Sequence, residues 1–296
     1  VTADEAGAGV KDGMTIMVGG FLATGSPEVL MDALVRKGVK HLTVIANDGG
    51  LDAGQPAGEF GGKTARGVGK LLEHHMVDHL IASHIGVNPK INEQIAEGTL
   101  KYTLVPQGTL AEKIRAAAYG LGGVLTPTGV ATPMETEVDE LGREKKVVEI
   151  EGKKYLFELP LHADYSFIRA SVADKFGNYM CAKATKNFNY VMAGASTKTI
   201  IAPEKLVEIG EIDPDYFAVA GVLVADYIPE DVVVTLHSEN GFAGLGDIAT
   251  EETLDVDIIN SGGTYVTALP RVKYFDTAES FGLVRGGHVQ ATVLGA

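Results

Sequence analysis

Short apolar segments that end in glycine or amide residues recur along the first two-thirds of the chain. Residues 14–18, 42–45, 79–82 and 102–105 have strand character, and each is followed by a turn. Helical spacing of apolar residues follows in places, notably after Pro27 and over 110–118. Strand, glycine-bearing turn and helix in repetition predict an α/β fold with a largely parallel sheet and right-handed crossovers.

The turns after these strands predict a ligand crevice. They are 19–21, 47–50, 83–86 and 106–109. Because the carboxyl ends of parallel strands meet at one edge of a sheet, all four turns should lie together. Amides placed there, such as those of Asn47 and Gln107, can donate an N–H group to a developing oxyanion. Taken singly, each turn is more simply explained as a tight connection between a strand and a helix.

The rest of the chain indicates a change of architecture and then a second unit. Residues 129–161 predict an antiparallel excursion with a hairpin at Glu151-Gly152, and Thr109 is expected to cap the helix over 110–118. A second apolar unit follows, which predicts domains at 1–224 and 225–296. The expected elements of the second unit are strands over 232–236, 257–259 and 289–294 and a helix over 279–284. We therefore expect two open, largely parallel α/β units, of which the second is incomplete.

Composition limits the kinds of partner that the protein can bind and indicates its cellular compartment. A net charge of −14 argues against a nucleic-acid partner, which needs a basic face. The single cysteine, Cys181, allows no internal disulfide or cysteine-based metal site, and its apolar surroundings predict a buried structural thiol. His75 and His79 have the spacing of a helical metal pair, but a solvated helix face explains them better, so no metal is expected. With no signal peptide or membrane span, we expect a cytoplasmic protein without a membrane partner.

Glu239 is a second candidate for chemistry, because it follows the apolar run 231–236 and precedes Asn240-Gly241. A carboxylate held before a glycine turn can act as a nucleophile or as a general base. The ordinary alternative is a solvated glutamate at the end of a strand. Dinucleotide-binding, Walker-type and nucleophile-elbow motifs are absent from the sequence.

At this point the motifs resemble those of the family I coenzyme A-transferases. Residues 12–21, completed by Gly25 and Pro27, resemble the first signature of that family, and residues 236–242 resemble the second. The similarity covers nearly the whole chain and is strongest to the 3-oxoacid and acetate–butyrate–acetoacetate type. The further matching positions are residues 106–112, 126–129 and 186–189, Asn260, and residues 285–288.

The resemblance implies an α half over 1–224 and part of a β half over 225–296. It implies the two-domain α/β fold of the family, and Glu239 as the nucleophile that forms a covalent glutamyl-CoA thioester. It also implies that coenzyme A is a substrate, that no separate cofactor is needed, and that α/β pairing and further oligomerisation occur. The residues implied to bind substrate or the oxyanion are Asn47, Gln107, Asn240, Gly244 and Gly246. The loops implied to line the CoA site contain Gly19, Gly20, Phe21, Gly25 and Gly108.

The sequence departs from the family pattern at two places. Ala243 stands where a larger aliphatic residue is usual, which is a minor change. At Val224-Ala225 the α half runs directly into the β half without the usual helix and glycine-rich turn. We therefore expect that residues of the natural chain are missing at this junction and after Ala296.

Two other functions remain open at this stage. One is an open-sheet sugar-phosphate isomerase with Glu239 as the general base. The other is a non-catalytic regulator that binds acyl-CoA. The sequence does not name the acyl donor or the acid acceptor.

Overall fold

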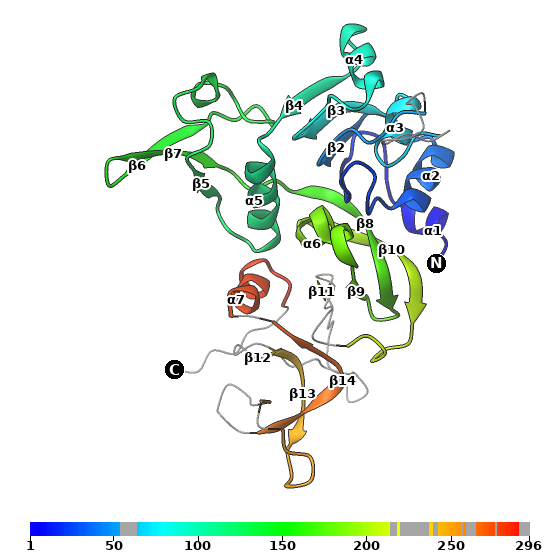
Figure 1. Cartoon of the computed structure of the whole chain (residues 1–296), viewed down its shortest axis with the longest axis vertical. Helices are drawn as coiled ribbons and strands as arrows, with labels where there is room; N and C mark the ends of the chain where they lie inside the picture. Colours follow the sequence, from blue (N-terminus) through cyan, green and yellow to red (C-terminus); the bar gives the residue numbers. More distant parts are fainter. Residues whose placement is uncertain are drawn as a thin grey trace. The chain divides into compact units, whose positions relative to one another are not determined.

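The computed structural model contains two compact units (Figure 1). One comprises Val1–Ala170 and Cys181–Ala202, and the other comprises Ser171–Met180 and Pro203–Ala296. The predicted junction at Val224-Ala225 lies outside the described residues, so the division into 1–224 and 225–296 stays a prediction. The structure describes residues 1–53, 64–213, 218–219, 237–238, 242–255, 257–258, 265–275 and 277–289.

The first unit is built on a parallel sheet, as predicted. Four strands pair side by side in chain order, and all of these pairs are parallel. They are β1 (Thr15–Val18), β2 (Leu42–Ala46), β3 (Val77–Ala82) and β4 (Lys101–Leu104). On the other side of β1 lies β8 (Ala163–Asp174), also parallel, and β10 (Ser196–Val207) pairs with β8. The last residues of β8 and β10 belong to the second unit.

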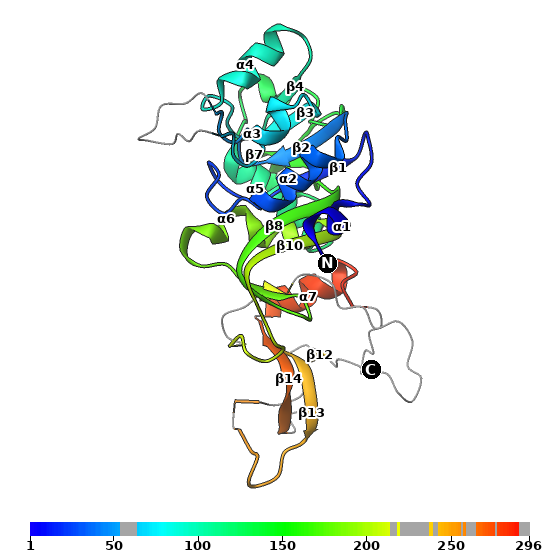
Figure 2. The same ribbon diagram turned by 90° about the vertical axis from the view of Figure 1, so that its right-hand side faces the viewer.

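Helices cover both faces of this sheet, α1–α4 along one and α5 and α6 along the other (Figures 1 and 2). Consecutive right-handed crossovers in one direction place the connecting helices on the same face, which explains the grouping of α2–α4. Strand residues are buried on both sides, for example Ile16, Met17 and Val18. The helices are α1 (Ala3–Gly7), α2 (Glu28–Lys37), α3 (Gly69–Glu73), α4 (Pro89–Ala96), α5 (Gln107–Ala118) and α6 (Asn187–Ala193).

Helix α5 begins earlier than the sequence pattern predicted. Pro106 is its N-cap, and Thr109 lies inside the first turn, where its buried hydroxyl has no hydrogen-bond partner in the described part of the chain. The prediction that Thr109 caps the helix is therefore wrong. Pro106 has an extended backbone, with a ψ angle of 132°, and the helical conformation begins directly after it.

The predicted antiparallel excursion is confirmed as a three-stranded sheet in the order β5-β7-β6. Its strands are β5 (Val124–Thr126), β6 (Lys146–Ile150) and β7 (Lys153–Glu158), and a short 3₁₀ helix at Pro133–Glu135 precedes β6. The predicted hairpin turn is also present. Glu151 and Gly152 have φ angles of 50° and 75°, which is the left-handed pair that a type I′ turn requires.

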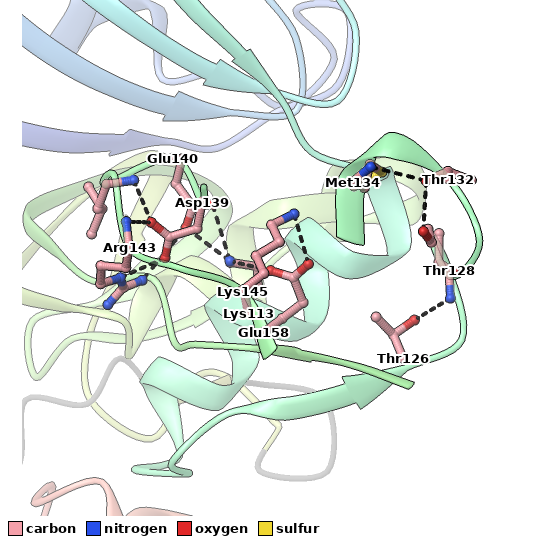
Figure 3. A network of polar contacts seen from close by, with 12 residues as sticks. Lys113, Thr126, Thr128, Thr132, Met134, Asp139, Glu140, Arg143, Lys145 and Glu158 are labelled. Atoms are coloured by element: carbon pink, nitrogen blue, oxygen red, sulfur yellow. Dashed lines mark hydrogen bonds and ion pairs between the residues drawn. The ribbon is translucent and has the colours of Figure 1, made fainter. Parts of the chain in front are cut away.

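A buried ion cluster joins this excursion to α5 (Figure 3). Lys113 Nζ lies 3.0 Å from Glu140 Oε1 and 2.8 Å from Glu158 Oε2, and Lys113 is fully buried. Lys145 Nζ lies 3.1 Å from the other oxygen of Glu158. Next to this group, Arg143 Nε donates to Asp139 Oδ2 at 2.6 Å. Each buried carboxylate of the cluster is thus paired with a lysine or an arginine.

The separate three-stranded sheet of the second unit is antiparallel, in contrast to the parallel arrangement expected there. The connection between β13 and β14 contains turns and no helix in its described residues, which suits antiparallel neighbours. Two short strands pair beside the end of β8, namely β9 (Asn178–Met180) and β11 (Ala218–Val219). The separate sheet has the order β12 (His237–Ser238), β13 (Phe242–Ile248) and β14 (Val266–Tyr274).

The four elements predicted for the second unit have different outcomes. The helix predicted over 279–284 is confirmed as α7 (Thr277–Arg285). The strand predicted over 257–259 is wrong in its described part, because Asp255 Oδ1 accepts from Asp257 N at 3.0 Å and bends the chain into a turn. Residues 232–236 and 290–294 lie outside the described residues, and Val289 is a bend.

Candidate functional site

The carboxyl edge of the parallel sheet brings the four predicted turns together, because β1, β2, β3 and β4 are neighbours and run in one direction. Residues 48 and 84, which follow β2 and β3, form a further parallel bridge beyond the strands. The expectation that these strand ends share one edge is confirmed. This edge is the candidate site.

Two side-chain amides at this edge are joined in a directed chain of hydrogen bonds. Gln107 Nε2 donates to Asn47 Oδ1 at 2.6 Å, and Asn47 Nδ2 donates to Asp48 Oδ2 at 2.7 Å. Ser83 Oγ donates to the Asn47 carbonyl at 2.8 Å and lies 3.1 Å from Asn47 Oδ1. Asn47 is buried while Gln107 is exposed. The chain of hydrogen bonds therefore runs from the buried carboxylate of Asp48 to the amide of Gln107, which solvent or a ligand can reach.

Asp48 also holds the loop after β1. Its Oδ2 accepts from Leu22 N at 2.8 Å, and its Oδ1 accepts from Gly50 N at 2.8 Å. Leu22 lies in the Phe21–Thr24 turn, which is closed by two backbone hydrogen bonds between its end residues. Leu22 and Ala23 have φ angles of 45° and 66°, a left-handed conformation that costs free energy in non-glycine residues. One buried carboxylate thus ties a strained turn to the amide chain.

The glycines of the β1 loop are explained first by packing. A Cβ atom on Gly19 would stand 2.0 Å from Asn189 Oδ1, and one on Gly20 would stand 2.3 Å from Ser26 Oγ. Asn189 is fully buried and donates to the Gly25 carbonyl at 3.0 Å. Phe21 is exposed beside them. A close approach to CoA by these loops, which the resemblance implies, stays a prediction.

The start of α5 offers uncommitted donors at the same edge. Pro106 provides no side-chain cap for the first-turn N–H groups, and among the described residues a Cβ atom on Gly108 would meet nothing within 4 Å. Helix N-termini carry partial positive charge and stabilise anions near them. The open space at Gly108 thus adjoins the donors of both the helix and Gln107.

The second half of the predicted site is described only in part. Glu239 and Asn240, with Gly241, lie outside the described residues, and so does Asn260. Gly244 and Gly246 lie on β13, where a Cβ atom on Gly246 would stand 2.4 Å from Thr267 Oγ1 of β14. The assignment of these residues to a substrate site stays a prediction.

Cys181, His75 and His79 lie where their roles are structural. Cys181 is buried, as predicted, and burial raises the pKa of its thiol to about 12. His79 lies on β3 and His75 in a turn before it, so the two share no helix face. Burial and the charge of Lys101 lower the pKa of His79 to about 4, and its Nε2 lies 2.9 Å from Thr103 Oγ1. Within the described residues, no group of three or more His, Cys, Asp or Glu is placed to hold a metal ion.

Sequence reasoning named Asn47 and Gln107 but gave no role to Asp48 or Ser83. The signal for Asp48 was its position before Gly49-Gly50, since aspartate there commonly accepts the N–H two residues later. No helix in the described part of the chain is long and apolar enough to span a membrane.

Comparison with known proteins identifies relatives for both halves. A family model described as coenzyme A transferase matches residues 1–230 and 219–296. The probable coenzyme A transferase subunit alpha of Bacillus subtilis is 41% identical over 233 residues, which cover 79% of this chain and 94% of the relative.

A human mitochondrial succinyl-CoA:3-ketoacid coenzyme A transferase is 30% identical over 358 residues, with 97% of this chain and 67% of the relative covered. Because 358 exceeds the 296 residues of this chain, the human protein has residues without a counterpart here.

The fold has solved counterparts as well. An acyl-CoA transferase from Escherichia coli O157:H7, in a thioester complex with CoA, superimposes with a TM-score of 0.62 at 23% identity. The match covers 76% of this chain and 48% of that chain, so the present chain spans about half the length of the solved protein. At this level of identity the likeness concerns the fold.

Proposed function

Because this chain belongs to the coenzyme A transferase family, we propose that it transfers CoA reversibly from an acyl-CoA to a short-chain carboxylic or 3-oxo acid. The observation that carries the proposal is the amide chain at the sheet edge, in which Gln107 donates to Asn47 and stays exposed. Relatives named as subunit alpha support a further proposal, that the 1–224 part pairs with a β-type part and that the protein oligomerises.

The proposed reaction starts at Glu239. Its carboxylate attacks the thioester carbonyl, the carbon–sulfur bond breaks, and an acyl-glutamyl anhydride and CoA thiolate form. The thiolate then attacks the glutamyl carbonyl of the anhydride, which gives the glutamyl-CoA thioester and releases the acyl group as a carboxylate. A second acid reverses these steps and leaves as the new acyl-CoA. No net proton transfer is needed, since carboxylates are exchanged for carboxylates.

Each of these additions places a negative charge on a carbonyl oxygen. Preorganised N–H donors stabilise such an oxyanion, at about 3 kcal/mol per donor in comparable acyl-transfer sites. We propose that Gln107, Asn47 and Asn240 take this role together with the backbone N–H groups at Gly244 and Gly246. Gly19, Gly20, Phe21, Gly25 and Gly108 are proposed to line the path of CoA. Water has to be excluded, because it would hydrolyse the anhydride.

Trapping with borohydride tests the proposal. The protein is incubated with acyl-CoA and reduced, and its peptides are examined for a Glu239 side chain converted to the alcohol. We expect this product in the wild type and not in Glu239→Gln, which keeps the size of the side chain and removes the nucleophile. A wild-type protein that binds acyl-CoA without forming the adduct would contradict the covalent mechanism and favour an acyl-CoA-binding regulator.

A further inference from the structure

We propose that Asp48 is a positioning residue, whose carboxylate sets the direction of the Asn47 and Gln107 amides and holds the Phe21–Thr24 turn beside them. The proposal rests on the proposed function, in which these two amides serve the acyl-transfer step. Asp48 is buried, with 6% of its surface exposed, so it acts through the two amides and not by contact with the substrate.

The direction of the amide chain follows from the chemistry of its buried end. An ionised carboxylate only accepts hydrogen bonds, so Asn47 has to turn its NH2 group toward Asp48. The carbonyl oxygen of Asn47 then points the other way, where only a donor can meet it. Gln107 supplies such a donor through Nε2 at 2.6 Å, and the Ser83 hydroxyl lies 3.1 Å from the same oxygen. Without the carboxylate, both amides could rotate by half a turn and present oxygen where nitrogen now stands.

The same carboxylate secures the loop after β1. Leu22 N donates to Asp48 Oδ2, which is the oxygen that also accepts from Asn47. Leu22 and Ala23 both have positive φ angles, so the turn needs an external contact to persist. Phe21, which lies at the start of this turn, is exposed. Asp48 therefore fixes the position of one loop relative to the amides on two other strand ends.

A second aspartate in the chain provides a matched control. Asp174 is buried to a similar degree, at 4% exposed, and accepts three N–H groups as Asp48 does. Its donors are Phe176 N at 2.9 Å, Asn178 N at 3.0 Å and the Asn178 side-chain amide at 2.9 Å. Asp174 is the last residue of β8, just before the turn to β9, and it is separate from the candidate site residues in sequence and in hydrogen bonding.

The experiment compares Asp48→Ala with Asp174→Ala in thermal unfolding and in steady-state CoA transfer. Both variants should lose similar stability, because both leave three donors unpaired. Only Asp48→Ala should lower kcat, by about 10- to 100-fold, with KM for acyl-CoA within about twofold of the wild type. Asp48→Asn should recover part of the loss, since its carbonyl oxygen can still accept from Leu22 and Asn47. Equal kcat values for the two alanine variants would overturn the proposal.

A second readout separates this proposal from the proposed function. The side-chain NH2 resonances of Gln107, assigned with Gln107→Glu, should shift in Asp48→Ala and Asp48→Asn and stay in place in Asp174→Ala. If the wild type neither transfers CoA nor forms the Glu239 adduct, the proposed function is wrong, and these resonances still judge the role of Asp48. Unshifted Gln107 resonances in both Asp48 variants would refute the positioning role, whatever the activity.

Discussion

Two polar networks include residues of α5, and they differ in how much of each network is exposed to solvent. The edge network consists of Asn47, Asp48, Ser83 and Gln107, whose hydrogen bonds end at an exposed amide. The ion cluster consists of Lys113, Glu140, Glu158 and Lys145, together with the Asp139–Arg143 pair. In that cluster Lys113 and both glutamates are almost entirely shut off from water.

The difference shows how burial divides polar groups between stability and chemistry. Burying a charge costs free energy unless a group of opposite charge lies beside it. The ion cluster therefore stabilises the fold only when all of its members are present. An exposed amide costs little to leave free, so the edge network can keep N–H groups available for a ligand. We therefore expect substitutions in the ion cluster to act on folding and those in the edge network to act on turnover.

Lys113→Met is expected to have the largest effect on stability. It fills the space of the side chain but leaves Glu140 and Glu158 as buried, uncompensated carboxylates, so the free energy of unfolding should fall by about 3–5 kcal/mol. Urea unfolding followed by circular dichroism measures this. Lys90→Met, which breaks the exposed pair with Glu93 at 2.7 Å, is the control and should cost less than about 1 kcal/mol. Similar losses for both would show that burial does not distinguish the cluster.

Gln107→Ala is expected to have the opposite profile. Its side chain is exposed, so the free energy of unfolding should change by less than about 0.5 kcal/mol. Loss of an oxyanion donor should lower kcat by about 100-fold, which steady-state CoA transfer measures. The exposed Glu112 on the same helix provides the control, because its interaction in the described structure is the pair with Arg115. A Gln107 variant that unfolds easily or keeps full turnover would contradict the division between the two networks.

As the pH falls, the stability contributed by His79 in the parallel sheet should be lost at a higher pH than the stability contributed by Glu158 in the ion cluster. Burial and Lys101 lower the pKa of His79 to about 4 from 6.5, so the unfolded state binds more protons between these values and stability falls as pH falls through this window. For Glu158, burial acts to raise the pKa, but the bonds and charges of Lys113 and Lys145 outweigh it and lower the pKa below 4.5. The stability it contributes is therefore lost only at lower pH.

The measurement is the free energy of unfolding between pH 7 and pH 3. His79→Asn should flatten the slope between about pH 6.5 and 4, while Glu158→Gln should change the slope only below about pH 4.5. A wild-type slope above pH 4.5 that His79→Asn leaves unchanged would assign the effect to another group.

The sequence was most informative where the pattern is local and repeated. Apolar strands followed by glycine turns predicted the parallel sheet and its shared carboxyl edge, and Glu151-Gly152 predicted the hairpin, because both depend on backbone preferences of a few adjacent residues. The amides of Asn47 and Gln107 were found for the same reason. Asn47 stands directly after a strand, and Gln107 opens the helix that follows the next-but-one strand.

The misses concern contacts between residues far apart in the chain. Lys113, Glu140 and Glu158 have no periodic pattern, and only the packed structure shows that they meet. The same holds for the contact of Asp48 with Leu22, which joins two loops across 26 positions. In the second unit, the strand predicted over 257–259 was wrong because the side chain of Asp255 bends the backbone, which overrides the weak strand preference of a short apolar segment.

The course of β8 and β10 has a practical consequence for anyone dividing this protein into fragments. Residues 171–180 belong to the second unit although both of their flanks belong to the first. In that unit Val207 and Ile212 form a small core with Val172 and Met180. If the chain were cut after Ala202, the amino-terminal piece would lose Val207 and Ile212, and its Val172 and Met180 would be exposed to solvent. Producing the protein as two fragments therefore requires a later boundary or co-expression of both fragments.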